Sequence, residues 1–276
     1  MLRFLIFGTG LRLAAGRHFS RLAHVLSIVL FFALTSCSES SVYPASEGFN
    51  AKGSDKKAIE IVDRMMEKLG GWEAWKNTRF LAWTYFGQYQ IWDKQESLFR
   101  HEKGNIISIM NLNKRAGQVY INGVQETDSL KMYGHLSTAY THFVANTYFL
   151  FMPYKMKDPG VTLLYRGEGQ TMEGKPADIV RMIFNEVGLS PENMHDVWID
   201  KETGLPAQWA FYTSREEKVP AFVRKWSDYK DYNGLKLATN RNSYTDTLSI
   251  SHIVATDFVP KEVFLSPTPV DKTLVK

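Results

Sequence analysis

The chain has 276 residues, of which 44% are hydrophobic and 22% are charged, as in ordinary globular proteins. The single Cys excludes a disulfide framework and a Cys-rich zinc module. The formal net charge of +4 comes from 33 basic and 29 acidic residues. A mildly basic chain suggests nucleic acid or anionic lipid as a partner, but this inference holds only if the basic residues lie in the folded part.

The positive charge is concentrated at the N-terminus. Residues 1–36 contain four of the 33 basic residues, Arg3, Arg12, Arg17 and Arg21, and none of the acidic ones. Removing this stretch leaves 29 residues of each charge, so the rest of the chain is neutral and we expect no nucleic-acid partner. An apolar run of about ten residues follows the arginines, too short for the ~20 residues of a membrane-spanning helix. Residues 1–36 are therefore predicted to be a secretory signal peptide.

The only cysteine follows this run directly. Leu34-Thr35-Ser36-Cys37 has the apolar residue, the two small residues and the thiol that mark the lipidation site of bacterial lipoproteins. The alternative is a chance cysteine beside an apolar segment. We predict that Cys37 carries a lipid anchor, which gains ~0.8 kcal/mol for each CH₂ group buried in the membrane. Ser38 after the cysteine favours the outer membrane, with the protein facing the periplasm, although surface exposure stays open.

Residues 37–54 are rich in Ser, Gly, Ala and Glu and show no apolar period, so they are predicted to be a flexible tether. Residues 55–276 are predicted to form a single domain. The domain begins with an expected helix that Ser54 or Asp55 caps and that Gly70-Gly71 ends.

Strand patterns dominate after this helix. The expected strands lie within residues 80–92, 106–110, 119–121, 161–166, 177–184, 196–199, 207–212, 221–229, 235–245 and 248–258. Short turns such as Asn122-Gly123 and Asn233-Gly234 connect them, which favours an antiparallel meander over a parallel sheet.

One helical segment interrupts the strands. Apolar residues recur every three or four positions from Asp128 to about Asn146 and predict an amphipathic helix, followed by an aromatic cluster at residues 148–153. Such a cluster is either part of the core or a lid over a cavity.

Catalytic and metal-binding motifs are not apparent. His101-Glu102 lacks the second histidine of the zinc-protease pattern, and no phosphate-binding loop or nucleophile elbow occurs. His135 and His142 would lie ~10.5 Å apart along one helix, too far for one metal ion. His195 is expected to point to the opposite face of its strand from Asp196. We predict a non-enzyme with no metal site and no cofactor.

Aromatic residues are the most unusual feature of the sequence. They crowd the strands near residues 83–92 and 198–226, where core packing is the simpler explanation. Where both faces of a strand are aromatic, helices or a ligand must cover one of them.

Several motifs carry a resemblance. These are Leu69-Gly70-Gly71-Trp72-Glu73-Ala74-Trp75, Phe151-Met152-Pro153-Tyr154-Lys155 with Asp158-Pro159-Gly160, Asp200-Lys201-Glu202-Thr203-Gly204-Leu205, and Trp226-Ser227-Asp228-Tyr229 with Asn233-Gly234-Leu235. With the lipidation motif and the tether, the chain resembles a family of Bacteroidota-type lipoproteins and, more distantly, the LolA/LolB-like lipoprotein carriers. The protruding hydrophobic loop of the receptor has no clear counterpart.

The resemblance implies a mainly β (α+β) fold, with a large curved antiparallel sheet, a half-barrel, and about two helices on or over its concave face. It also implies an envelope lipoprotein that binds a lipid, an acyl chain or another apolar ligand without catalysis. The expected ligand-binding residues are aromatic: Trp83, Tyr85, Tyr140, Phe143, Phe149, Phe151 and Trp209. The alternative is a structural or interaction lipoprotein of an envelope complex, with a filled core.

Overall fold

The computed structural model describes residues 43–276. The predicted signal peptide and Cys37 lie outside the described residues, and so do positions 37–42 of the predicted tether. Within residues 43–276, no helix is both long enough and apolar enough to cross a membrane.

Three α-helices and four short 3-10 helices occur in the described chain. They are α2 Lys56–Lys68, α3 Trp72–Asn77, α4 Ser129–Phe151, η1 Ala51–Gly53, η2 Met152–Lys155, η3 Lys261–Phe264 and η4 Lys272–Leu274. The helix predicted to end at Gly70-Gly71 is α2. The predicted interrupting helix is α4, which continues past Asn146 to Phe151 and takes in most of the aromatic cluster.

The strands form three antiparallel sheets. The seven-stranded sheet has the order β14-β1-β2-β3-β4-β5-β6, the five-stranded sheet β11-β10-β9-β8-β7, and β12 pairs with β13. The strands are β1 Phe80–Tyr85, β2 Gln88–Asp93, β3 Leu98–Lys103, β4 Ile106–Asn111, β5 Ala116–Ile121, β6 Val124–Gln125, β7 Val161–Gln170, β8 Pro176–Phe184, β9 Met194–Asp200, β10 Pro206–Tyr212, β11 Phe222–Lys225, β12 Ser227–Tyr232, β13 Leu235–Asn240 and β14 Ser251–Thr256.

The expectation of a mainly β, antiparallel fold with few helices is confirmed. The strands are shared among three sheets rather than one. Strand β3 was not predicted, because its sequence Leu-Phe-Arg-His-Glu-Lys reads as polar. Phe86-Gly87 divides the predicted strand over 80–92 into β1 and β2, since both residues adopt a positive φ at the turn.

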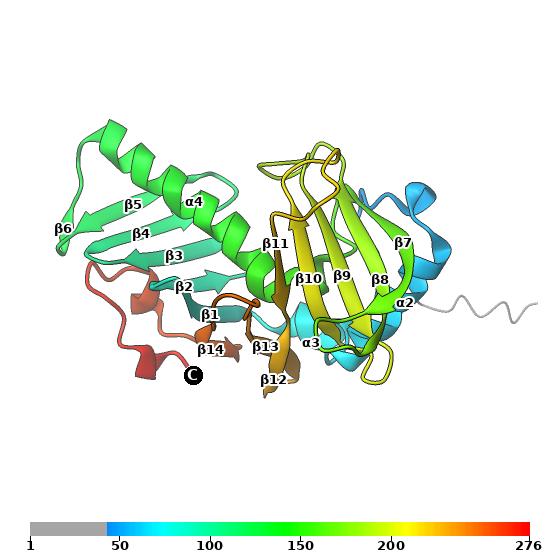
Figure 1. The fold of residues 1–276 in the computed structure, drawn as a ribbon. Helices are drawn as coiled ribbons and strands as arrows, with labels where there is room; N and C mark the ends of the chain where they lie inside the picture. Colours follow the sequence, from blue (N-terminus) through cyan, green and yellow to red (C-terminus); the bar gives the residue numbers. More distant parts are fainter. Residues whose placement is uncertain (1–42) are drawn as a thin grey trace, which may run out of the picture. The chain divides into compact units, whose positions relative to one another are not determined.

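Helix α4 lies across one face of the seven-stranded sheet and ends beside the five-stranded sheet (Figure 1). Asp128 begins the helix by accepting hydrogen bonds from the backbone N–H groups of Leu130 and Lys131. At the other end, Phe149 packs against Trp209 of β10, with ring centroids 5.0 Å apart. The helix therefore reaches from one sheet to the other.

One continuous hydrophobic core joins the helices to the inner faces of both large sheets. Trp75 of α3 illustrates it, because its ring stacks on Tyr154 and also contacts Phe151 and Trp92. Strand alternation sends Leu81 and Trp83 of β1 into this core, and Phe80 and Ala82 to the opposite face.

The C-terminal segment covers that opposite face of the seven-stranded sheet. Val259, Val263 and Val275 pack against Phe80 and Ile91. We expected helices or a ligand to cover the second face of these aromatic strands; a largely irregular segment of the chain itself does so here.

The described part of the predicted tether, residues 43–54, packs on the domain. Tyr43 is 1% exposed, and its hydroxyl donates a 2.9 Å hydrogen bond to the carbonyl of Tyr154. The backbone N–H of Asn50 donates to the carbonyl of Val161. The packed chain therefore starts before Asp55, because Tyr43 supplies a buried apolar ring that the composition of the segment does not reveal.

Candidate ligand-binding cavity

A cavity of about 440 Å³ lies between the C-terminal half of α4 and the five-stranded sheet. The segment of residues 185–193 between β8 and β9 forms one side of it. Its volume falls within the usual range of small-molecule sites, roughly 300–1,000 Å³. Most of its wall is apolar, with six aromatic side chains: Tyr148, Phe149, Phe184, Trp209, Phe211 and Phe222.

Strand register places the sheet side of this wall. In the pairing of β9, β10 and β11, His195 lies opposite Phe211, and Phe211 lies opposite Phe222. Directly opposed residues share one face of an antiparallel sheet. The three rings therefore form a row across the sheet, and Trp209, two residues before Phe211, faces the same side.

Helix α4 supplies the opposite wall. Its lining residues are Thr141, Val144, Ala145, Tyr148 and Phe149. Their spacing of three and four positions places them along one stripe of the helix. The same helix thus covers the seven-stranded sheet with one part of its surface and lines the cavity with another.

His195 is the unusual polar group of the wall. It is 6% exposed, and rings of Tyr148, Phe184, Trp209 and Phe211 surround it, with centroids 5.3–5.9 Å away. Its Nδ1 atom has no hydrogen-bond partner among the described residues. Burial lowers the pKa of His195 to about 3, so the imidazole is neutral at physiological pH.

Asp196, the next residue, faces the other side of β9, as the alternation of the strand predicts. Its carboxylate accepts two 2.7 Å hydrogen bonds from Arg181 and one of 3.1 Å from the Tyr212 hydroxyl. The predicted opposition of His195 and Asp196 is therefore confirmed, and Asp196 belongs to a separate ion pair.

Two of the seven predicted ligand-binding residues, Phe149 and Trp209, line the cavity. Trp83, Tyr85 and Phe151 are buried core residues, and Phe151 packs edge-on against Trp83. Tyr85 contacts a lining residue from behind, since its ring lies 5.0 Å from that of Phe149. All residues that line the cavity therefore come from the second half of the chain, and no residue of β1 is among them.

The remaining two predicted residues lie on α4 against the seven-stranded sheet. Phe143 packs against Trp92 and Phe99, with ring centroids 5.1 and 4.9 Å away. The Tyr140 hydroxyl accepts a hydrogen bond from Arg115, whose guanidinium lies over the ring. His195, Phe211 and Phe222 also line the cavity but were not predicted as ligand-binding residues. The alternation of side chains in their strands is visible in the sequence. That α4 packs opposite them is not, because this contact joins segments far apart in the chain.

A second polar group lies under α4. The Nδ1 atom of His142 is 3.1 Å from Nε2 of His101, which also contacts Gln88. Burial, with His142 as the second cause, lowers the pKa of His101 to about 3. His142 thus pairs with a histidine of β3 rather than with His135. Within residues 43–276, no group of three or more His, Cys, Asp and Glu side chains is arranged to hold a metal ion.

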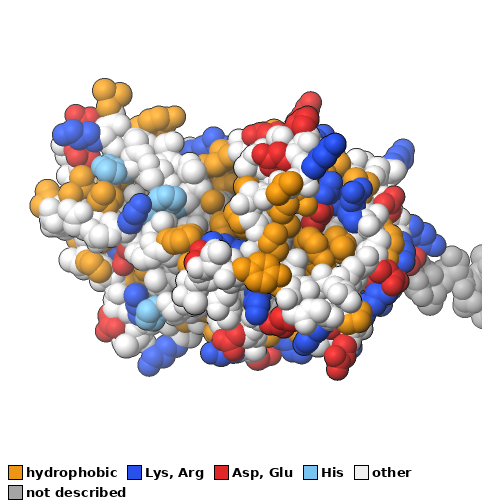
Figure 2. Space-filling model, in the orientation of Figure 1, with side chains coloured by type: hydrophobic (Ala, Val, Ile, Leu, Met, Phe, Trp, Pro, Cys, Tyr) orange, Lys and Arg blue, Asp and Glu red, His pale blue; other side chains and the backbone are white. Residues whose placement is uncertain are grey.

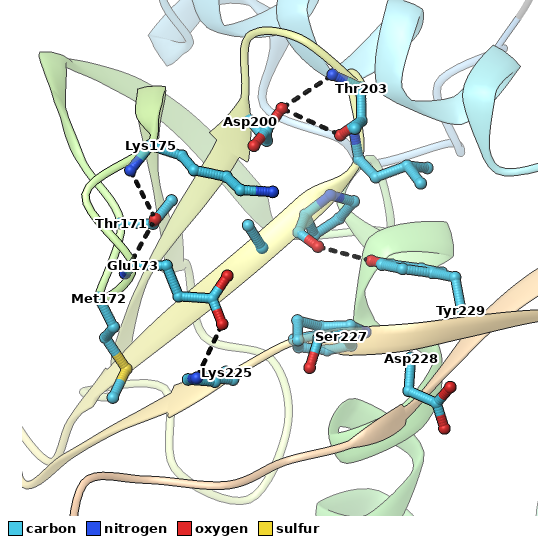
Figure 3. Close-up of a pocket in the computed structure, with 14 residues that line it drawn as sticks. Thr171, Met172, Glu173, Lys175, Asp200, Thr203, Lys225, Ser227, Asp228 and Tyr229 are labelled. Carbon is cyan, nitrogen blue, oxygen red and sulfur yellow. Dashed lines mark hydrogen bonds and ion pairs between the residues drawn. The ribbon is translucent and has the colours of Figure 1, made fainter.

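A smaller pocket of about 160 Å³ lies beside the β7–β8 turn (Figure 3). Its polar groups bind one another: Lys225 donates to Glu173, and the Tyr229 hydroxyl donates to the carbonyl of Pro206. Since these groups already have partners, the larger cavity is the better candidate for a ligand.

A scan of protein-family models finds no match, and a sequence search of curated proteins finds none either. The lipoprotein family suggested by the sequence motifs therefore stays a prediction.

Among solved structures, the chain is similar to a DUF1329 family protein from Desulfovibrio piger, with 8% identity, a TM-score of 0.42, and coverage of 79% of this chain and 98% of that one. An uncharacterised conserved protein from Thermus thermophilus aligns at 13% identity and a TM-score of 0.27, over 79% and 97% of the two chains. The Pseudomonas aeruginosa MucA/MucB complex aligns at 12% identity and a TM-score of 0.22, over 79% and 61%. Likenesses this weak leave the function of the chain open.

Proposed function

We propose that this protein is a bacterial cell-envelope lipoprotein that binds a lipid acyl chain or another apolar molecule in the cavity between α4 and the five-stranded sheet, without catalysis. The observation that carries the proposal is the aromatic wall of this cavity, about 440 Å³ in volume. Apolar surface removed from water stabilises a complex by about 25 cal/mol per Å². An acyl chain is apolar along its whole length, so each of its CH₂ groups that contacts the aromatic wall contributes to the free energy of binding.

The anchor is a separate part of the proposal. Cys37 carries the lipid and holds the protein at the membrane, with the outer membrane facing the periplasm as the proposed location. Metabolic labelling with a radioactive fatty acid tests this: the full chain takes up label, and Cys37→Ser abolishes it and releases the protein from the membrane fraction. Equal labelling of both forms would refute the anchor and leave the cavity untouched.

Titration with the neutral fluorescent probe N-phenyl-naphthylamine tests the cavity. We expect a saturable increase in fluorescence that fatty acyl compounds reverse. Ala145 is an exposed lining residue at the rim of the cavity, so Ala145→Trp should fill it with little effect on the fold. Ser137→Trp is the matched control, since Ser137 is exposed on the same helix but outside the cavity. Binding that survives Ala145→Trp unchanged would place the apolar site elsewhere.

Exposed apolar residues support the second candidate, an interaction lipoprotein of an envelope complex. Leu130 and Tyr133 at the start of α4 are 84% and 71% exposed, and hydrophobic side chains stand out there (Figure 2). Crosslinking in cells followed by affinity purification would favour this candidate if one stoichiometric partner appeared while the probe failed to bind.

A further inference from the structure

The cavity contains a polar side chain that the protein itself does not satisfy. His195 lies at the β9 end of the aromatic row on the sheet, it is 94% buried, and its Nδ1 has no partner among the described residues. A buried polar atom without a hydrogen bond costs free energy, so such atoms usually have a partner in the functional state. Nothing in the packing requires a histidine here, because the rings around it are apolar and Phe would fill the same space.

The neighbouring ring has the same deficiency. Trp209 is 2% exposed, its Nε1–H has no acceptor among residues 43–276, and its ring lies 5.3 Å from that of His195. An indole nitrogen can only donate, and a neutral imidazole offers one donor and one acceptor. Both nitrogen atoms are themselves covered by protein, so a ligand in the cavity reaches His195 through a rotation of its ring, and an acceptor such as an oxygen atom would then satisfy its N–H group.

The charges around the cavity restrict the kind of oxygen. Asp158 is the one charged residue in the cavity lining, and it pairs with Lys155. Neither Lys nor Arg belongs to the lining, and His195 is uncharged at neutral pH because burial lowers its pKa to about 3. A carboxylate or phosphate inside this cavity would lose its hydration without gaining a cationic partner.

From these observations we propose that the cavity selects an uncharged apolar molecule with one acceptor oxygen, an alcohol, ester or ketone, and that His195 binds this oxygen. The inference rests on the proposed function and names the ligand class of the same site. It distinguishes an ester or alcohol group from the free carboxylate of a fatty acid.

Competition against N-phenyl-naphthylamine at pH 7.5 tests the proposal with four compounds of equal chain length: dodecane, dodecanol, methyl dodecanoate and dodecanoate. We expect the alcohol and the ester to displace the probe at lower concentration than the alkane, by about fivefold, the net effect of one hydrogen bond. Dodecanoate should be the weakest competitor of the three oxygen-containing compounds. A carboxylate that competes as well as its ester would overturn the proposal.

His195→Phe assigns the preference to this residue. The variant should still bind the probe and the alkane, which shows that it is folded, but it should lose the preference for the alcohol over the alkane. His195→Gln keeps a hydrogen-bonding group and should restore part of it. Ser137→Ala, a change of an exposed residue of α4 outside the cavity, should leave the ranking unchanged. An unchanged preference in His195→Phe contradicts the role of His195.

The two failures are distinguishable. If the wild-type protein binds neither the probe nor any of the four compounds, the proposed apolar site itself is refuted. If all four compounds bind equally, the apolar site stands and only the selection for an uncharged oxygen is wrong.

Discussion

At the scale of single residues, two buried histidines make the stability of the protein depend on pH. His101 and His195 are both less than a tenth exposed, and burial lowers the pKa of each from 6.5 to about 3. In the unfolded chain both histidines take up a proton as the pH falls below about 6.5. The folded state resists this protonation, so the two residues link stability to pH.

The free energy of unfolding should therefore be highest above pH 6.5 and fall as the pH drops from 6.5 toward 3, because the unfolded state binds more protons over this range. The limiting slope is about 1.4 kcal/mol per pH unit for each histidine. Urea unfolding at several pH values measures it. In His195→Phe the slope should decrease by the contribution of one histidine. The carboxylates are the same in both proteins, so their contribution to the slope cancels in the comparison. Identical slopes would show that His195 is not buried as a neutral imidazole.

Gly70 and Gly71 differ in a way that only their surroundings reveal. Both adopt a positive φ, +114° and +88°, which favours glycine. A Cβ atom at Gly70 would overlap the carbonyl oxygen of Gly234 in the β12–β13 turn, whereas one at Gly71 would meet no atom within 4 Å. The close approach is maintained by a 2.9 Å hydrogen bond from Lys236 N–H to the carbonyl of Leu69.

Gly71→Ala should cost about 1–2 kcal/mol of stability from backbone strain alone. Gly70→Ala should cost about 1–3 kcal/mol more, because the overlap forces the backbone to shift. Chemical denaturation of the two variants measures the difference, in which the strain of positive φ largely cancels. Equal costs would mean that α2 and the β12–β13 turn are not in contact.

At the scale of elements, the C-terminal segment depends on one buried side chain. Arg100 of β3 is fully buried, and its guanidinium donates hydrogen bonds to the carbonyls of Val263, Ser266 and Thr268. It also forms an ion pair with Glu102, which accepts a hydrogen bond from the N–H of Val270. This network fastens the irregular segment to the sheet at positions where no strand pairing does so.

Arg100→Met should destabilise the protein by about 3–5 kcal/mol, since it leaves the Glu102 carboxylate without its cationic partner and three carbonyls without their hydrogen bonds to the guanidinium. Lys76→Met is the control: Lys76 also pairs with a carboxylate, that of Glu73, but the two side chains are 59% and 72% exposed, and such pairs contribute about 0–1 kcal/mol. Limited proteolysis should cut Arg100→Met first within residues 259–276. Similar stabilities of the two variants would contradict the fastening role of Arg100.

At the scale of the whole described molecule, the two large sheets share one hydrophobic core. Helix α4 packs on the seven-stranded sheet through Phe143 and on the five-stranded sheet through Phe149. Tyr154 connects further elements, because its hydroxyl donates to the carbonyls of Leu69 and Lys236. Neither sheet can lose its packing without exposing part of the other.

Residues 43–276 should therefore unfold as one cooperative unit. Hydrogen exchange in increasing denaturant should show amides of β2–β4 and of β8–β10 merging into a single global opening. Trp75→Ala, which removes a ring at the centre of the core, should lower the opening free energy of both groups equally. A five-stranded sheet that opens at lower denaturant than the other would show two separate units.

Local patterns in the sequence determined much of the fold. The apolar periods of α2 and α4, the turns at Asn122-Gly123 and Asn233-Gly234, and the opposed faces of His195 and Asp196 depend on neighbours a few residues away. The concentration of positive charge in residues 1–36 is also fixed by the sequence alone. Strand β3 escaped prediction because Arg100 and His101 are buried by partners distant in the chain.

Tertiary structure alone decided how the strands divide among three sheets and which aromatic residues meet. Phe149 and Trp209 line the cavity, whereas Trp83 and Phe151 fill the core, although all four are aromatic residues in helical or strand patterns. Residue type gives the tendency to be buried, but the choice between core and cavity wall depends on what faces each ring. That is set by long-range pairing and by the path of α4, which no local pattern encodes.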